Sequence, residues 1–132
     1  METYVLMLQT DPDDKDITES ALQEIDNSTP LYFIPGINEL KDFVTIKGMP
    51  SVILLNDRGA THNCQAILKQ LKNDASYNHI PVIVLGEVSS TEYIRQCYRA
   101  GANTFITKPS SVEDTRKKIA AFFDYWFDVA ET

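Results

Sequence analysis

The sequence predicts an α/β fold in which a parallel sheet is covered by helices on both faces. Five short apolar runs are near-continuous rather than alternating, which is typical of strands buried on both sides. Segments with helical spacing separate these runs, and repeated strand–helix alternation specifies parallel strands joined by right-handed crossovers. The predicted strands are residues 4–8, 31–34, 52–55, 80–85 and 104–106.

The first two helical segments follow the first two runs. Residues 13–25 place Ile17, Ala21 and Ile25 four apart after an acidic start, which suits a helix N-terminus. A short second helix contains Leu40 and ends before Gly48.

The last three helices have clear boundary residues. Residues 64–71 follow the i, i+3, i+4, i+7 template, with apolar side chains at 64, 67, 68 and 71. Ser89 or Ser90 can cap a fourth helix that ends at Gly101. Ser110 or Ser111 can open the last helix, which we expect to run to about residue 129.

Composition narrows the class of protein. The 132 residues suit a single domain spanning 1–132, with no separate output domain expected. The net charge of −7 argues against binding to duplex nucleic acid, which needs a basic face. No apolar stretch approaches the length of a membrane span, and residues 1–3 lack the basic region of a signal peptide. We therefore expect a cytoplasmic protein in which Cys64 and Cys97 are reduced, buried apolar residues.

In parallel α/β sheets the working site lies at the carboxyl ends of the strands. In this chain, polar residues and one glycine stand at the ends of the predicted strands, at positions 9–11, 56–57, 86–87 and 107–108. These positions are the candidates for chemistry.

At these positions the chain resembles a response-regulator receiver domain, and the resemblance covers nearly its whole length. The segments concerned are YVLMLQTDPDD at 4–14, PSVILLN at 50–56, NHIPVIVLG at 78–86 and, most specific, GANTFITKP at 101–109. The segment FFDYWFDV at 122–129 is similar to the last helix of single-domain receivers of the phytochrome-linked type.

The resemblance implies a flavodoxin-like three-layer sandwich with strand order 2-1-3-4-5 and a role in two-component (phosphorelay) signalling. In that family an acidic pair after the first strand holds Mg²⁺. An Asp ending the third strand accepts a phosphoryl group from a histidine kinase. A hydroxyl after the fourth strand and a Lys after the fifth contact that group, since its charge must be neutralised.

This sequence departs from the pattern at four of those positions. Gln9 and Thr10 stand where the acidic pair belongs, Asn56 stands at the phosphoacceptor, and Gly86 stands at the hydroxyl. A neutral amide is a very poor nucleophile, and amide or hydroxyl oxygens are weak Mg²⁺ ligands without compensating charge. We therefore expect an atypical pseudo-receiver that is not an enzyme, needs no cofactor and cannot form an acyl phosphate at residue 56.

Three positions keep the residue types of the family, namely Lys108, Pro109 and Phe105. Lys108 is expected either to bond the Asn56 side-chain oxygen or to pair with Asp57 or Asp11. Phe105 is expected to be a buried or partly buried core aromatic.

Two carboxylates offer an alternative reading in which Mg²⁺ or a phosphoryl group still binds. Asp57 could be the acceptor if the register slipped by one, but successive strand side chains point to opposite faces, so we expect an exposed loop carboxylate instead. Asp11 could be a displaced metal ligand in a cluster with Asp13 and Asp14, although acidic residues at a helix N-terminus need no metal to explain them. The two histidines, His62 and His79, are expected at the surface.

The expected partners are proteins, a histidine kinase or another signalling protein. On the last helix, one apolar stripe that includes Val112, Ile119 and Phe123 should face the sheet. Phe127 falls on the edge of this stripe and Tyr125 falls well away from it, and these two aromatics suggest an interface, such as a homodimer contact. Tyr93 and Tyr98 on the fourth helix mark a second possible contact surface.

Overall fold

The computed structural model describes residues 4–8, 12–25, 28–57, 64–87, 90–109 and 111–128. It contains a five-stranded, all-parallel sheet of order β2-β1-β3-β4-β5. The strands are β1 Val5–Leu8, β2 Leu31–Ile34, β3 Val52–Asp57, β4 Val82–Gly86 and β5 Thr104–Thr107. This is the flavodoxin-like topology that the resemblance to receiver domains implied.

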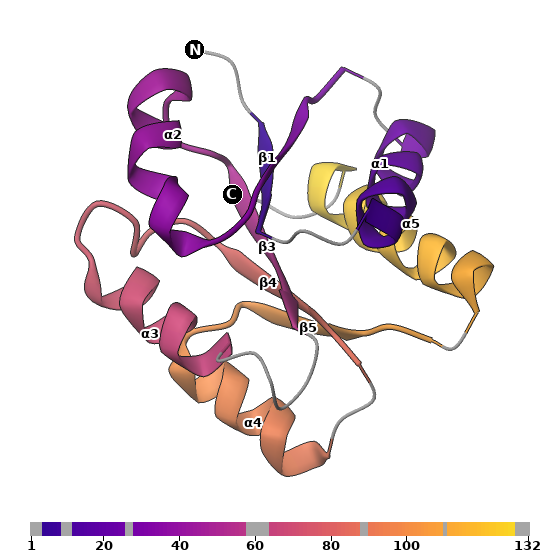
Figure 1. Cartoon of the computed structure of the whole chain (residues 1–132). Coiled ribbons are helices and arrows are strands. Elements are labelled where there is room, and N and C mark those ends of the chain that lie inside the picture. The colour runs from indigo at the N-terminus through magenta and orange to yellow at the C-terminus, as the bar shows by residue number, and fades with distance from the viewer. Residues whose placement is uncertain are drawn as a thin grey trace.

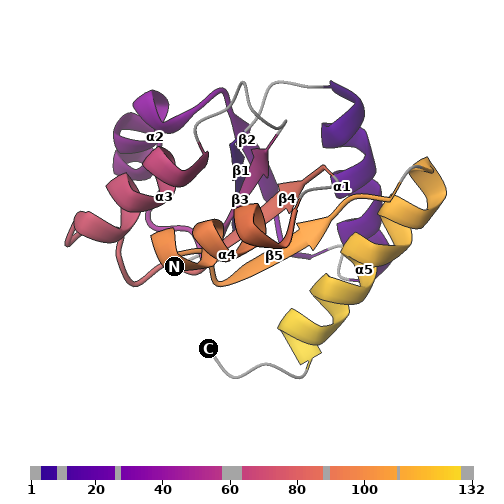
Figure 2. The same ribbon diagram turned by 90° about the horizontal axis from the view of Figure 1, so that it is seen from below.

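Helices cover both faces of this sheet and complete three layers (Figures 1 and 2). One face is covered by α1 (Pro12–Ile25) and α5 (Val112–Asp128), which pack against each other. The other face is covered by α2 (Leu40–Lys47), α3 (Cys64–Asn73) and α4 (Thr91–Ala100), with a short 3₁₀ turn, η1 (Ile37–Glu39), leading into α2.

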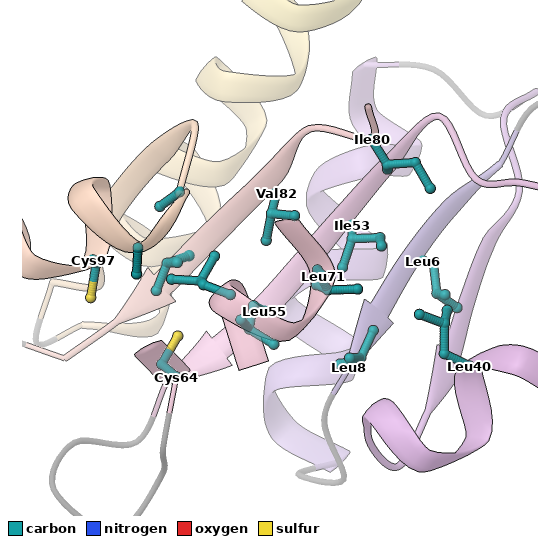
Figure 3. Packing of buried hydrophobic residues seen from close by; sticks show 14 of the residues in the cluster. Leu6, Leu8, Leu40, Ile53, Leu55, Cys64, Leu71, Ile80, Val82 and Cys97 are labelled. Carbon is teal, nitrogen blue, oxygen red and sulfur yellow. The ribbon is translucent and has the colours of Figure 1, made fainter. Parts of the chain in front are cut away.

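Two apolar cores separate the layers because strand side chains alternate between faces. Leu6, Ile53 and Leu55 face α2, α3 and α4, where they pack with Leu71 and Cys64 (Figure 3). The intervening strand residues pack against the other two helices, where the central members are Met7, Leu54, Ile83, Ile119 and Phe123. Each large aliphatic side chain buried in this way contributes roughly 1.5–3 kcal/mol to folding.

Capping residues mark the start of α4 and the ends of α2 and α4, as the sequence indicated. The Ser90 hydroxyl accepts a hydrogen bond from the Tyr93 backbone N–H at 3.1 Å, which caps α4. Gly48 and Gly101 follow α2 and α4 with φ of 87° and 125°, conformations that strongly favour glycine.

Three details of the sequence prediction were wrong. β3 is longer than predicted and includes Asn56 and Asp57, while β4 begins later, at Val82, because Ile80 closes a turn by bonding the Tyr77 carbonyl. Val112 does not join the apolar stripe of α5: it is the first residue of that helix and is 66% exposed. No helix in the described ranges is long and apolar enough to cross a membrane.

Candidate functional site at the carboxyl end of the sheet

The pleat of β3 sends its last two side chains to opposite faces of the sheet. Asn56 continues the alternation of Val52 and Leu54 and therefore points toward α1 and α5. Asp57 continues the alternation of Ile53 and Leu55 and points toward α3 and α4. The carboxyl end of the sheet therefore holds two separate polar arrangements.

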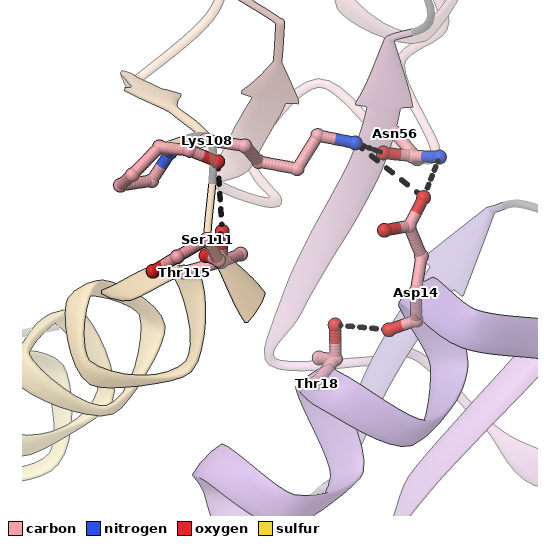
Figure 4. A network of polar contacts seen from close by, with 7 residues as sticks. Asp14, Thr18, Asn56, Lys108, Ser111 and Thr115 are labelled. Atoms are coloured by element: carbon pink, nitrogen blue, oxygen red, sulfur yellow. Dashed lines mark hydrogen bonds and ion pairs between the residues drawn. The ribbon is translucent and has the colours of Figure 1, made fainter. Parts of the chain in front are cut away.

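On the first face, Asp14, Asn56 and Lys108 form a closed polar network (Figure 4). The Lys108 ammonium donates to Asn56 Oδ1 at 2.8 Å and lies 3.4 Å from Asp14 Oδ2. The Asn56 amide nitrogen donates to the same Asp14 oxygen at 3.0 Å. The amide oxygen and nitrogen of Asn56 are thus both hydrogen-bonded. The side chains of Lys108 and Asp14 are mostly buried, with exposed fractions of 14% and 18%.

Local structure fixes each member of this network. Asp14 lies in the first turn of α1, and the Thr18 hydroxyl bonds its backbone carbonyl at 2.8 Å. The backbone N–H of Lys108 extends the β4–β5 ladder by donating to the Gly86 carbonyl at 2.7 Å. The Thr115 hydroxyl donates toward the Pro109 carbonyl at 3.2 Å, which ties the turn after β5 to α5.

A cavity of about 460 Å³ opens beside the network, between α1, the end of β4 and the start of α5. Asp14, Glu87 and Lys108 supply its charged lining, and Ile17, Pro109 and Val112 supply apolar surface. Within the described residues, no three His, Cys, Asp or Glu side chains gather closely enough to hold a metal ion.

The expected hydrogen bond between Lys108 and Asn56 is confirmed. Among the described residues Lys108 forms its ion pair with Asp14 rather than with Asp57, while Asp11 lies outside the described residues. Sequence reasoning attributed Asp14 to helix N-terminal charge and missed its role. Its spacing was the available indication, because Asp14, Thr18 and Ala21 are i, i+4 and i+7 on the buried face of α1.

On the other face, Asp57 is buried, with 1% of its surface exposed. Its carboxylate accepts a hydrogen bond from the Tyr93 hydroxyl of α4. The expectation of an exposed loop carboxylate was therefore wrong, because β3 continues through this residue and α3 and α4 cover it. Burial, and then the Asp57 carboxylate, raise the pKa of Tyr93 above its ordinary value.

Gly86 and Phe105 fit together beside this pair. A Cβ on Gly86 would lie 2.4 Å from Phe105 Cζ, so the ring occupies the space that a larger residue would need. The ring also packs edge-on against Tyr93, with centroids 6.3 Å apart. Phe105 is half-buried in the apolar layer, as predicted.

The remaining predicted residues divide into three groups. Four residues lie outside the described residues, namely Gln9, Thr10, Asp11 and His62, and so does the side chain of Phe127. Tyr98 and Tyr125 are exposed, at 46% and 55%, and so is His79. Tyr93 is half-buried, and its hydroxyl points inward to Asp57.

Cys64 and Cys97 are free and buried, as expected. Burial, followed by the nearby Asp57 carboxylate and the other thiol, raises the pKa of Cys64. Burial also raises the pKa of Cys97. Both side chains therefore stay protonated near neutral pH and act as small apolar groups.

Known structures share this fold over the whole chain. The response regulator RPA3017 from red light signalling of R. palustris is 22% identical with a TM-score of 0.77, covering 98% of this chain and 96% of its own. The phosphorylated cyanobacterial phytochrome response regulator RcpA is 16% identical with a TM-score of 0.81, covering 99% and 98%. A response regulator from Hahella chejuensis is 23% identical with a TM-score of 0.81, covering 99% of each chain.

Sequence comparison gives a more limited match. The probable methanogenesis regulatory protein FilR2 of Methanothrix harundinacea (strain 6Ac) is 29% identical over 80 residues. The match covers 61% of this chain and about half (52%) of that relative. No family model matches the chain. The structural matches show that the fold is that of response-regulator receiver domains.

Proposed function

We propose that this chain is a receiver-like protein of two-component signalling that acts in the cytoplasm by protein contact, without aspartyl phosphorylation and without enzymatic activity. The observation that supports the proposal most directly is the Asp14–Asn56–Lys108 network. An amide stands where receiver domains have their phosphoacceptor, and both of its polar atoms are hydrogen-bonded.

The chemistry of the network favours a fixed state. Formation of an acyl phosphate requires a carboxylate oxygen to attack phosphorus, and the Asn56 amide offers no such nucleophile. Lys108, which in receiver domains neutralises the transferred group, is already paired with Asp14. The network therefore supplies internally the charge balance that a phosphoryl group would otherwise provide.

The alternative is a phosphorylatable or metal-binding receiver that uses Asp57 or Asp11 with Lys108. The placement of Asp57 disfavours it as the acceptor, because Asp57 and Lys108 lie on opposite faces of the sheet and Tyr93 bonds the Asp57 carboxylate. Under this alternative Mg²⁺ would be the required cofactor, and carboxylates would be its ligands.

An NMR titration of the full chain tests the proposal. We expect the backbone amide resonances of Asn56, Gly86 and Lys108 to stay unchanged when millimolar Mg²⁺ and acetyl phosphate are added together. A titratable shift of these resonances, abolished by Asp57→Asn or Asp11→Asn, would instead support the alternative.

The partner surface in this proposal includes the exposed part of α5. Tyr125 is 55% exposed, although Phe122, Phe123 and Trp126 of the same helix pack against the core, and such a residue suits a homodimer or partner contact. Light scattering tests the homodimer. We expect Tyr125→Ser to lower the concentration-dependent mass, and a strict monomer at high concentration would count against self-association.

A further inference from the structure

The strand β2 forms one edge of the sheet, next to β1 (Figure 2). It is a short apolar strand, Leu-Tyr-Phe-Ile, in which Leu31, Tyr32 and Phe33 are all half-buried. Prolines at positions 30 and 35 bracket it. An edge strand of this kind can accept one further strand over a window of four residues.

The register with β1 shows which backbone groups are left unpaired. The Val5 N–H bonds the Pro30 carbonyl at 2.9 Å, and Val5 is aligned with Leu31. In a parallel ladder with this hydrogen-bonding pattern, the backbone N–H and C=O groups of Tyr32 and Ile34 point toward β1, and those of Leu31 and Phe33 point outward. No described residue bonds the backbone N–H or C=O of Leu31 or Phe33.

The opposite edge of the sheet is protected. On β5, the outward N–H of Phe105 donates to the Tyr98 hydroxyl at 3.0 Å. The outward carbonyl of Thr107 accepts from the Lys118 ammonium at 2.7 Å. Side chains therefore cap the β5 edge, whereas the β2 edge keeps its backbone groups available.

Two lysines stand over the aromatic rings of β2, one on each face of the sheet. The Lys15 ammonium of α1 lies 5.0 Å from the centre of the Phe33 ring. The Lys47 ammonium at the end of α2 lies 4.9 Å from the centre of the Tyr32 ring. A second copy of this chain, paired along β2, would bring one more cation to each face, and edge lysines are a known means of preventing self-pairing.

We propose that the β2 edge is a docking site for an extended, acidic segment of a partner protein, which adds as a sixth strand. Main-chain hydrogen bonds to Leu31 and Phe33 would hold the segment. Two successive acidic residues would point to opposite faces, one toward Lys15 and the other toward Lys47, because strand side chains alternate.

Other charges limit how strongly such a segment binds. The chain carries a net charge of −7, and exposed carboxylates of Asp13, Asp16 and Glu19 share α1 with Lys15. The attraction must therefore come from the two cations at contact range, since salt screens charges beyond about 8–10 Å. The surface favours modest affinity with a strict preference for acidic over basic residues.

Amide hydrogen exchange of the full ¹⁵N-labelled chain tests the proposal. In the free protein, we expect the amides of Leu31 and Phe33 to exchange rapidly, while those of Tyr32 and Ile34 are protected by β1. The probe is a capped peptide, Thr-Val-Glu-Asp-Val-Thr, compared with its Lys-Lys counterpart. The acidic peptide should slow exchange at Leu31 and Phe33, while the basic peptide should not.

Matched variants separate the lysines from general charge. Lys15→Gln with Lys47→Gln should weaken binding of the acidic peptide by about tenfold, as expected for two partly exposed ion pairs. Lys69→Gln on α3, which removes an exposed lysine far from β2, should leave binding unchanged. Equal binding by both peptides, or no protection by the acidic peptide at millimolar concentration, would overturn the proposal. Protection that appears without peptide as the protein concentration rises would assign the edge to a second copy and would also overturn it.

Discussion

Replacing Gly86 with alanine should force the Phe105 ring out of its position. The added Cβ would lie 2.4 Å from Phe105 Cζ, 3.0 Å from Cε1 and 3.3 Å from Cε2. Carbon atoms in contact prefer about 3.5–4.0 Å, so the closest atom must move by roughly 1 Å or more. Because Phe105 is half-buried, we expect the ring to swing outward rather than the strands to separate.

The cost of that movement follows from what the ring loses. The ring loses part of its burial against Gly86 and its edge-on contact with Tyr93. An aromatic pair of this kind contributes about 0.5–1.5 kcal/mol beyond the free energy of burying its apolar surface. We expect a total loss of about 1–2 kcal/mol in the free energy of unfolding, within the range for overpacking. For a chain of this size that lowers Tm by roughly 3–8 °C.

Thermal and urea denaturation followed by circular dichroism measures this loss. Gly36→Ala is the matched control, since a Cβ there meets only Glu39 Oε2 at 3.8 Å and the backbone is extended. Phe105→Leu in the Gly86→Ala background should recover part of the stability. A Gly86→Ala protein as stable as the parent, or additive effects of the two substitutions, would show that the Phe105 ring does not depend on the missing Cβ at position 86.

Three further predictions concern the two polar arrangements and their titration. Lys108→Met should cost about 1–3 kcal/mol in urea denaturation, because it leaves the mostly buried Asp14 carboxylate without its cation, and its effect should be strongly non-additive with Asp14→Asn. Tyr93→Phe should cost about 1–3 kcal/mol because the buried Asp57 carboxylate loses a donor, whereas Tyr125→Phe at an exposed position should change little. Burial raises the pKa of both Tyr93 and Tyr4. The protonated forms of both tyrosines are therefore favoured in the folded state. Their contribution to the free energy of unfolding should be complete below about pH 10 and should fall as the pH rises further. Absorbance at 295 nm follows the ionisation of tyrosine, and denaturation at pH 9–11 measures the stability.

Much of the fold could be predicted because its physical cause is local. Continuous apolar runs predicted the buried strands, and Ser90 and Gly101 marked the ends of α4 through their capping geometry. The end of β3 could not be predicted in the same way. Asn and Asp are depleted in strands, so the prediction stopped at Leu55, and only the pairing of Asn56 and Asp57 with β4 extends the strand.

Contacts between residues at neighbouring strand ends could be predicted from the sequence. Contacts that depend on how a helix lies over the sheet could not. The bond between Lys108 and Asn56 follows from their places at two strand ends. The contributions of Asp14 and Tyr93 depend on how α1 and α4 lie over the sheet, which the local sequence does not specify. Burial of Asp57 likewise depends on the helices that cover it.

Mass spectrometry of the intact protein can show whether it forms an aspartyl phosphate. The purified protein and an active receiver domain, as the control, are each incubated with Mg²⁺ and acetyl phosphate. We predict that the control gains a phosphoryl group and this protein gains none, because Asn56 lacks a nucleophilic carboxylate and Lys108 is paired with Asp14. A hydroxylamine-labile phosphoryl group on this protein would instead show that it is an aspartyl-phosphate receiver, and Asp57 would then be the first residue to substitute.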